Sequence, residues 1–322
     1  MKEFIIASND AGQRLDKFLS KATPLLPKGM LYKGIRLKRI KVNKKRCQPN
    51  QVLCEGDIVA LYLNDEFLEQ DHPKSFLAAP AKINIVYEDE NILLVDKPCG
   101  LVVHEDNDNT ADTLIHRVQH YLYLQKEYDP EQENSFAPAL CNRIDRNTCG
   151  IVIVAKNAET LRILNEKIKH RELTKQYLCI VHGKMPKPHQ LLIGYLQKDS
   201  STNLVQVQDK PFGQAKPIKT EYTVLDQRNN FSLLNVNLLT GRTHQIRAHL
   251  AHIGHPILGD GKYGINKEDK KLGYKYQALC SYKLTFSFSN DAGILNYLQG
   301  KTFTLKEVWF QNDFYNGRLF SL

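Results

Sequence analysis

The sequence contains no apolar run long enough to span a membrane, which needs about 20 consecutive apolar residues. Its longest apolar runs, such as Ile151–Ala155, are far shorter. Met1–Asp16 places acidic and polar side chains soon after a short apolar stretch and lacks the pattern of a signal peptide. We therefore expect a cytoplasmic protein with no membrane partner.

Paired cysteines are also missing. The seven cysteines are odd in number and include no C-x-x-C pair, so we predict free, mostly packed thiols rather than a disulfide framework or a zinc ribbon. Hydrophobic residues make up 42% of the 322 residues and charged residues 25%. This balance is typical of globular proteins and excludes a disordered or collagen-like chain. The length is sufficient for two domains.

Acidic residues are absent from Lys17 to Cys54, a stretch that contains eleven lysines and arginines. Residues 1–64 hold 13 basic residues against 5 acidic ones, whereas the rest of the chain holds 31 against 30. The net charge of +9 therefore comes almost wholly from the first fifth of the chain. Such a block is typical of proteins that bind a phosphate backbone. A solubilising charged face is the alternative, but the complete absence of acids favours nucleic acid.

The basic segment has the pattern of a small folded module. Apolar residues recur with helical spacing in residues 14–19 and again in residues 28–36. Short strand-like runs follow at residues 40–42 and 57–62, separated by turn residues. We predict a nucleic-acid-binding module of two helices and a small hairpin over residues 1–64.

Residues 65–80 carry acids and two prolines without periodicity, and we interpret them as a linker. A second domain is predicted over residues 81–322. Its predicted elements are a hairpin at 83–87 and 92–95, helices at 111–124, 157–170 and 243–253, and strands at 151–155, 176–182, 222–225, 231–239 and 279–288. Strands follow one another too often for a simple βαβ chain, so we predict an α+β fold with a mixed, largely antiparallel sheet.

Asp145 stands out because it lies between Arg143 and Arg146, shortly before a continuous apolar strand. This arrangement puts a carboxylate on a polar loop that is anchored in the core, a position typical of catalytic groups. The spacing fits equally well a structural carboxylate that pairs with Arg143 or caps a turn.

A second polar segment contains Arg242 and Arg247. Arg242 follows Gly241 and precedes a predicted helix, and Arg247 lies about one turn further along. Arginine in such a position can hold a carboxylate with two hydrogen bonds or neutralise a phosphate. An ordinary pair of solvated arginines is the alternative.

His244, His249, His252 and His255 lie within twelve residues, which raises the question of a zinc site. The segment lacks H-E-x-x-H, and no acid lies between the first and last of these histidines; Asp260 is the nearest carboxylate. We therefore predict no metal, and histidines that pack or contact phosphate instead. A zinc-dependent RNA enzyme is the alternative.

Four segments, in this order, resemble the RluA-type family of RNA pseudouridine synthases over residues 81–322. They are DKPCGLVVH (96–104), NRIDRNTCGIVIVAK (142–156), KQYLCIVHG (175–183) and LLTGRTHQIRAHLAHIGHPILGDGKYG (238–264). The last segment is long and specific, so chance agreement of all four is remote. The basic N-terminal segment resembles the αL RNA-binding module known from a small-subunit ribosomal protein.

The resemblance implies a uridine-to-pseudouridine isomerase in which Asp145 is the catalytic carboxylate and Arg247 pairs with it and keeps it ionised. Tyr177 would stack on the target uracil and remove a ribose proton, although a strand tyrosine by itself indicates only packing. Arg143 would fill the gap that the flipped nucleotide leaves in the RNA helix. The reaction is an isomerisation without redox change, so we expect no cofactor and no metal.

The same resemblance assigns Arg242, His244 and Leu258 to substrate binding. Two positions depart from the family pattern, since Asn142 stands where histidine is usual and Cys149 where serine is usual. The catalytic carboxylate and both flanking arginines remain, and we therefore expect an active enzyme.

The N-terminal module favours large-subunit ribosomal RNA as the substrate, because relatives that modify transfer RNA often lack it. A synthase that acts on transfer RNA is one alternative. A non-catalytic RNA-binding or ribosome-assembly factor is the other, and the departures at Asn142 and Cys149 are its support.

Overall fold

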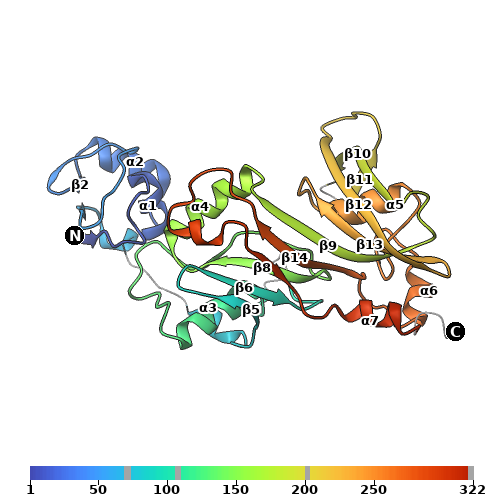
Figure 1. The fold of residues 1–322 in the computed structure, drawn as a ribbon. Coiled ribbons are helices and arrows are strands. Elements are labelled where there is room, and N and C mark those ends of the chain that lie inside the picture. The colour runs from blue at the N-terminus through green and yellow to red at the C-terminus, as the bar shows by residue number, and fades with distance from the viewer. Residues whose placement is uncertain (69–73, 106–109, 200–203, 318–322) are drawn as a thin grey trace.

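The computed structural model describes residues 1–68, 74–105, 110–199 and 204–317. The strands form two separate sheets, a four-stranded one and an eleven-stranded one. Figure 1 shows the small sheet with its helices at one end of an elongated molecule and α7 (Trp309–Tyr315) at the other. Within the described ranges, no helix combines the length and the apolar character needed to cross a membrane.

The N-terminal module, residues 1–68, has the strand order β1-β4-β2-β3. Its elements are β1 (Lys2–Ile5), α1 (Leu15–Ala22), α2 (Lys28–Arg36), β2 (Ile40–Val42), β3 (Lys45–Arg46) and β4 (Ile58–Leu61). Leu15, Phe18 and Leu19 are fully buried in its core, which confirms the predicted helical face. The sequence analysis missed β1, which pairs with β4 and so joins the two ends of the module.

The segment interpreted as a linker packs against the folded parts on both sides. Leu68 belongs to the core of the N-terminal module. Phe76, in a short 3-10 helix (Ser75–Ala78), packs against Tyr123 and Tyr128 of the following domain. Residues 69–73 of the predicted linker lie outside the described residues.

The large sheet has the order β11-β10-β12-β13-β9-β14-β8-β6-β5, with β15 on β14 and β7 on β8. The strands are β5 (Asn84–Glu88), β6 (Ile92–Lys97), β7 (Ala139–Leu140), β8 (Cys149–Ala155), β9 (Leu173–His182), β10 (His189–Lys198), β11 (Val205–Gln208), β12 (Lys216–Arg228), β13 (Phe231–Leu238), β14 (Leu279–Phe286) and β15 (Thr302–Thr304). Among the described residues, β8 and β14 form its one parallel ladder. The predicted mixed, largely antiparallel α+β fold is confirmed.

The middle of the large sheet is buried on both faces. Val95 and Val152 enter the cluster that also contains the buried face of α3 (Leu114–Leu124). Their strand neighbours Leu94 and Ile151 enter the opposite cluster, against α4 (Ala158–Lys169). A strand buried on both faces has a continuous apolar run instead of an alternating one, which explains the uninterrupted apolar sequence of β8.

The predicted helices correspond to α3, α4 and α5 (Gln245–His252). Two further short helices, α6 (Asn266–Lys271) and α7, follow. The predicted hairpin is present as antiparallel β5 and β6. The edge strand β11 and its neighbour β10 were not predicted.

Candidate active site

A groove of about 1300 Å³ lies where the loop 141–148 meets the start of α5. Seven lysine and arginine residues and two acidic residues line it. The basic residues are Arg143, Lys169, Arg171, Lys175, Lys219, Arg242 and Arg247. The groove is therefore positively charged, although basic and acidic residues nearly balance over the part of the chain after residue 64. Such a groove attracts a polyanion.

Six of the seven predicted site residues line this groove. They are Arg143, Asp145, Tyr177, Arg242, His244 and Arg247. They come from the loop before β8, from β9, and from the segment that enters α5. The fold thus brings together three segments that are far apart in the sequence.

Asp145 and Arg247 form an ion pair across the groove, with Arg247 Nη1 2.7 Å from Asp145 Oδ2. Arg247 is 6% exposed, and its guanidinium is also bound by Asp260, which is fully buried. Arg247 Nε and Nη2 donate to the two Asp260 oxygens at 2.7 and 2.8 Å. The sequence analysis noted Asp260 only as the nearest carboxylate to the histidines and missed this role. The Asp145 side chain remains 26% exposed toward the groove.

The electrostatics of this group keep Arg247 charged. Burial by itself lowers the pKa of Arg247, but the hydrogen bonds and charges of Asp260 and Asp145 outweigh burial and raise it above its ordinary value. Burial likewise acts to raise the pKa of Asp260, and the hydrogen bonds and charge of Arg247 reverse this and lower it. Arg247 is a permanent cation between two carboxylates.

A buried lysine braces the loop that carries Asp145. Lys97 is 0% exposed, and its Nζ donates to the carbonyl oxygens of Pro98, Leu101 and Arg146 at 2.8 to 2.9 Å. Gly100 N donates to the same Arg146 carbonyl at 2.9 Å. Burial lowers the pKa of Lys97 to about 8. The end of β6 therefore fixes the loop that carries Asp145.

The other end of the loop is fixed where β8 begins. Thr148 Oγ1 accepts a hydrogen bond from Gln277 Nε2 at 3.0 Å, and Thr148 N donates to Asp145 O at 3.0 Å, which closes a turn. Gly150 has φ +112°, and a Cβ there would lie 2.3 Å from Ser281 O. Only glycine permits this approach of β8 to β14.

The two departures from the family pattern have structural roles. Asn142 Oδ1 accepts a hydrogen bond from Ile153 N at 2.8 Å and so ties the loop to β8. Cys149 is buried, and its thiol lies 3.7 Å from the Leu279 carbonyl oxygen. Neither contact involves the Asp145 carboxylate, so both substitutions leave the Asp145–Arg247 pair in place.

Tyr177 lies in the groove wall with 5% of its surface exposed, beside Ile144 and Leu279. Burial raises the pKa of Tyr177 to about 12, assisted by the charge of Asp145, whereas a hydrogen bond with Ser281 acts in the opposite direction. The phenol is therefore neutral at physiological pH, and its ring offers an apolar face next to the ion pair.

The segment before α5 is held rigid by a buried amide. Gln245 Oε1 accepts hydrogen bonds from Thr240 Oγ1 (2.8 Å) and Arg242 N (3.1 Å), and its Nε2 donates to Lys219 O and Thr220 Oγ1, both at 3.0 Å. The side chains of Arg242 and Arg143 are exposed at the groove. Gln245, which the sequence analysis did not single out, thus fixes the backbone from which Arg242 projects.

His244 lies beside the Asp145 carboxylate. Its Nε2 is 3.9 Å from Asp145 Oδ2, and its Nδ1 is 3.0 Å from the Tyr263 hydroxyl. Burial lowers the pKa of His244, aided by the positive charges of Arg247 and Lys262 and opposed by Asp145. The imidazole is therefore neutral near pH 7.

The other histidines of the cluster bind different partners. His249 Nδ1 lies 3.0 Å from Thr220 Oγ1, and burial lowers its pKa to about 4. His252 Nε2 is 2.9 Å from Asp209 Oδ1, and His255 Nδ1 is 2.9 Å from the His182 carbonyl oxygen. The four imidazoles of this segment thus serve four separate hydrogen bonds.

Leu258 does not reach the groove. Its side chain is 0% exposed in a cluster with Leu178, Ile180 and Tyr274, away from Asp145. Its backbone N–H donates to Ile180 O at 2.9 Å and its carbonyl oxygen accepts from Ala278 N at 2.8 Å. These bonds fix Leu258 as core packing, and the predicted substrate contact through its side chain does not fit this geometry.

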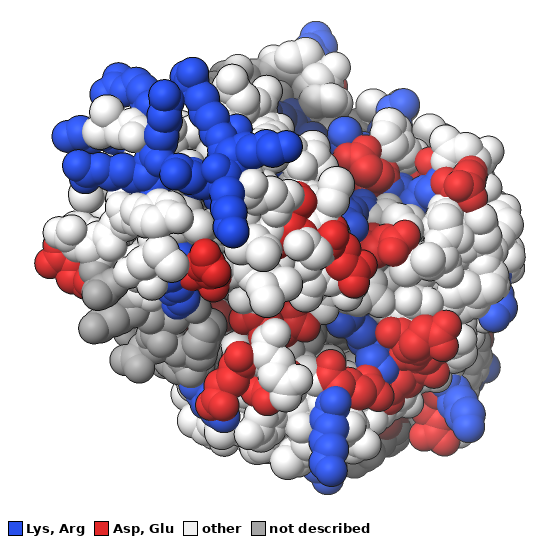
Figure 2. Space-filling model, turned by 90° about the vertical axis from the view of Figure 1, so that its left-hand side faces the viewer, with Lys and Arg blue, Asp and Glu red and all other residues white. Residues whose placement is uncertain are grey.

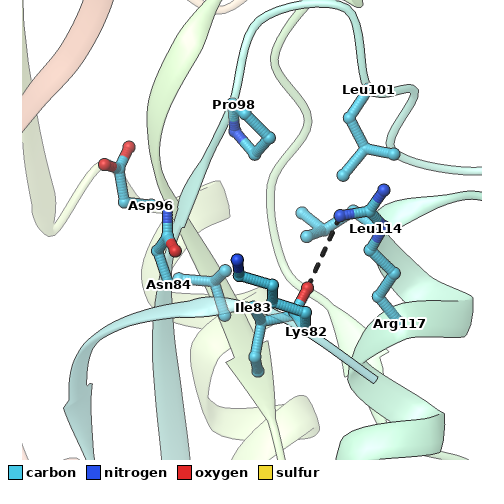
Figure 3. Close-up of a pocket in the computed structure, with 9 residues that line it drawn as sticks. Lys82, Ile83, Asn84, Asp96, Pro98, Leu101, Leu114 and Arg117 are labelled. Atoms are coloured by element: carbon cyan, nitrogen blue, oxygen red, sulfur yellow. Dashed lines mark hydrogen bonds between the residues drawn. The ribbon is translucent and has the colours of Figure 1, made fainter. Parts of the chain in front are cut away.

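A second, smaller pocket of about 310 Å³ lies beside the edge strand β5, and Figure 3 shows its lining. Arg117 reaches over it toward the Lys82 carbonyl oxygen at 3.5 Å and also binds Asp112 with Nε and Nη2 at 2.6 and 2.7 Å. Burial raises the pKa of Asp96 in its wall. The predicted site residues all lie outside this pocket.

The basic residues of the N-terminal module form a surface patch. Figure 2, which looks onto the end of the molecule that carries this module, shows lysine and arginine side chains gathered in one area and acidic side chains scattered over the rest of the face. The exposed basic residues of α2 and the β2–β3 region are Lys28, Lys33, Arg36, Lys38, Arg39, Lys44, Lys45 and Arg46. We refer to these residues as the basic face.

Comparisons with known proteins give a consistent result. The pattern of the RNA pseudouridylate synthase family matches residues 91–252, and that of the S4 domain matches residues 13–59. The chain is 36% identical over 296 residues to an uncharacterized RNA pseudouridine synthase of Mycoplasma genitalium, with 88% of each chain covered. It is 32% identical over 275 residues to the ribosomal large subunit pseudouridine synthase C of Haemophilus ducreyi, with 84% of this chain and 81% of that one covered. The solved structure of human RNA pseudouridylate synthase domain containing 4 has a similar fold, with a TM-score of 0.57 and 21% identity over 73% of this chain and 92% of that one.

Proposed function

The chain belongs to the RNA pseudouridine synthase family, and we propose that it isomerises uridines of large-subunit ribosomal RNA. The family membership makes the chain an isomerase that acts on RNA. Two observations support the ribosomal substrate, namely the relatives named ribosomal large subunit pseudouridine synthase C and the S4 domain with its basic face. From here on, the domain built on the large sheet is called the synthase domain.

Asp145 is the proposed catalytic carboxylate. It acts as nucleophile or electrostatic stabiliser while the bond between uracil N1 and ribose C1′ breaks, after which the uracil turns and C5 forms the new bond to C1′. C5 loses its proton and N1 gains one, so the reaction needs no oxidant. The ion pair with Arg247, 2.7 Å away, favours the charged form of Asp145 that this role requires.

Tyr177 is the proposed stacking partner of the target uracil. Its ring forms an apolar wall of the groove beside Asp145, and a nucleobase stacks well on such a surface. Removal of a ribose proton by Tyr177 requires a phenolate, and a pKa of about 12 makes that form rare near pH 7. The structure therefore supports stacking more than proton removal.

The exposed cations of the groove fit the proposed handling of RNA. An internal uridine must leave its helix to reach Asp145, at a cost of a few kcal/mol. Contacts of Lys169, Arg171 and Arg242 with phosphates offset this cost. We assign Arg143, which is exposed two residues before Asp145, to fill the vacated space.

The single observation that carries the proposal is the Asp145–Arg247 pair inside a positively charged groove. A non-catalytic RNA-binding factor would need only the basic surfaces. It would not need an arginine that is fixed by Asp260 and bonded to a carboxylate facing the groove.

Mapping pseudouridines in total RNA from cells with and without the gene tests the substrate. Loss of defined pseudouridines from large-subunit ribosomal RNA, restored by the wild-type gene, is the expected result. Loss from transfer RNA alone would show that the proposed substrate class is wrong, and an unchanged map would contradict the activity in that cell.

A further inference from the structure

The N-terminal module contacts the synthase domain through a polar surface that neither phosphate binding nor catalysis requires. Asn9, Asp10 and Gln13, just before α1, face the loop 129–136 between α3 and β7, together with the first turns of α4. In Figure 1 the module meets the rest of the chain at the end where α4 lies, and Asn9 and Ala11 contact that helix. The surface lies on the side of the module formed by residues 5–13, away from the α2 and β3 residues of the basic face.

Asp10 is the centre of the contact. Its side chain is 0% exposed, and it accepts hydrogen bonds from Asn134 Nδ2 at 2.7 Å and from Ser135 Oγ at 2.6 Å. The bond from its own module, donated by Ala7 N, is longer at 3.4 Å. A buried carboxylate is unfavourable unless donors satisfy it. The synthase domain supplies the two short bonds, so burial of Asp10 depends on the docked arrangement.

Asn9 joins the module to α4. Its Nδ2 donates to Glu133 Oε1 at 2.7 Å, and its Oδ1 accepts from Ala158 N at 3.1 Å. Ala158 is the first residue of α4, and an N–H at that position has no partner within the helix. Asn9 therefore caps a helix of the synthase domain, in addition to the local cap from Asn157.

Arg162 adds a second attachment one turn further along α4. Its Nη1 donates to the Ala11 carbonyl oxygen at 2.9 Å. A Cβ at Gly12, where φ is +76°, would lie 3.3 Å from the Arg162 guanidinium carbon. The glycine thus permits both the left-handed turn and the close approach of Arg162.

The helix that receives the module also reaches the catalytic groove. Ala158 contacts Asn9, and Ile168 and Lys169 at the other end of α4 line the groove. Eleven residue steps of an α-helix span about 16 Å. The module and the groove are therefore joined by one short, rigid element rather than by the covalent linker alone.

We propose that these contacts form an interdomain latch, which holds the basic face at a fixed distance from Asp145 and so helps to select the uridine. The latch residues are Asn9, Asp10, Gln13, Glu133, Asn134, Ser135 and Arg162. The proposal rests on the proposed function, because it concerns which uridine of a structured RNA is modified. With the latch closed, a uridine reacts only where the same RNA also presents its backbone to the module. With the latch open, both RNA-binding surfaces persist but their spacing varies, so affinity is retained and selectivity falls.

Spin-label distances in the full chain test the latch without reference to activity. The labels are placed on Cys54, which is exposed on the module, and on a cysteine introduced at the exposed Leu124 of α3, with Cys99 and Cys141 replaced by serine. The parent protein is expected to give one narrow distance distribution, and the double variant Asn134→Ala/Ser135→Ala a broad one. Gln132→Ala is the matched control, because this side chain in the same loop bonds to Asp129 and not to the module. A broad distribution in the parent, or a narrow one in the latch variant, would overturn the proposal.

Site selection is tested on a large-subunit ribosomal RNA transcript by pseudouridine sequencing over a time course. The latch variant is expected to lose at least tenfold in rate at the sites that the wild type modifies, to modify additional uridines, and to keep RNA affinity within threefold. Unchanged rates and sites in a variant whose distances have broadened would overturn the role in selection. If the wild type leaves the transcript unmodified, the proposed substrate is wrong. The latch is then judged by the spin-label distances alone, and a broad distribution in the wild type would rule it out.

Discussion

Asp260 binds the guanidinium of Arg247 with both carboxylate oxygens, at 2.7 Å from Nε and 2.8 Å from Nη2. Its Oδ1 also accepts the backbone N–H groups of Lys262 at 2.9 Å and Tyr263 at 3.2 Å, so Asp260 itself is fixed. Arg247 can therefore offer Asp145 only Nη1, in one orientation. We interpret Asp260 as a positioning residue that acts on Asp145 through Arg247.

Replacing Asp260 by asparagine should lower kcat more than RNA affinity. The amide keeps the volume but loses the charge and one acceptor, so Arg247 is held less rigidly, and displacements near 1 Å at a reacting group cost about 10²-fold in rate. Single-turnover rates and RNA dissociation constants, measured on the same transcript, check this. Arg242→Ala is the comparison, since the loss of an exposed groove cation should weaken binding instead. A loss in affinity as large as the loss in rate would mean that Asp260 supports RNA binding.

Tyr177→Phe should stay close to the wild-type activity because the ring is kept. Tyr177→Ala should lose about 5- to 150-fold, because stacking of a base on an aromatic ring contributes about 1–3 kcal/mol. The raised pKa of Tyr177, about 12, also predicts that the wild-type rate shows no step from this phenol between pH 6 and pH 10. The pH profiles of wild type and Tyr177→Phe should then have the same shape. A wild-type step that is absent from the phenylalanine variant would support the proton-removing role.

Lys97→Met should destabilise the fold by about 1–3 kcal/mol at pH 7, because three carbonyl oxygens lose the hydrogen bonds that the ammonium donates. The pH dependence has a defined sign. The folded pKa of Lys97 is lowered to about 8, below the value of about 10.4 in an unfolded chain, so between these pH values the unfolded state binds more protons. The contribution of Lys97 to the free energy of unfolding therefore rises with pH over this window. Denaturant titrations should show a smaller rise in the methionine variant, and parallel curves would contradict the lowered pKa.

Substitution of Lys44, Lys45 and Arg46 by alanine should weaken RNA binding and lower the slope of log affinity against log salt by about 2, since each phosphate contact contributes about 0.7–0.9 to that slope. The control is the triple variant Lys267→Ala/Lys270→Ala/Lys271→Ala, which removes the same charge from exposed positions of α6. Equal slopes for the two triple variants would show that net charge, and not the basic face, governs binding.

Local sequence patterns predicted much of the fold. The helical spacing of Leu15, Phe18 and Leu19, and the amphipathic residues 28–36, gave α1 and α2 to within a few residues. The strand β10 was not predicted, because its apolar residues lie on both faces. Leu191 and Ile193 are exposed while Leu192 and Leu196 are buried, so the sequence shows no alternation of apolar and polar residues. A strand with one solvated face can still carry apolar side chains there, as Leu191 and Ile193 do.

The site could be predicted only in part from the residues themselves. The spacing around Asp145 left a structural carboxylate equally acceptable, and its pairing with Arg247 spans 102 residues, so the pairing came from family resemblance rather than from periodicity. The roles of Asp260 and Lys97 were not predicted, because they depend on burial, which tertiary packing determines. The burial of the Leu258 side chain could not be predicted either, since a place within a specific motif does not distinguish core packing from substrate contact.

Release of tritium from RNA labelled at uracil C5 tests the central claim most directly, because the proposed reaction replaces the C5–H bond by the bond to C1′. On a large-subunit ribosomal RNA transcript, the wild type should release tritium, and Asp145→Asn should release none above background while its RNA dissociation constant stays within about threefold, since the substitution leaves the cationic lining unchanged. Release by Asp145→Asn at the wild-type rate would contradict the account.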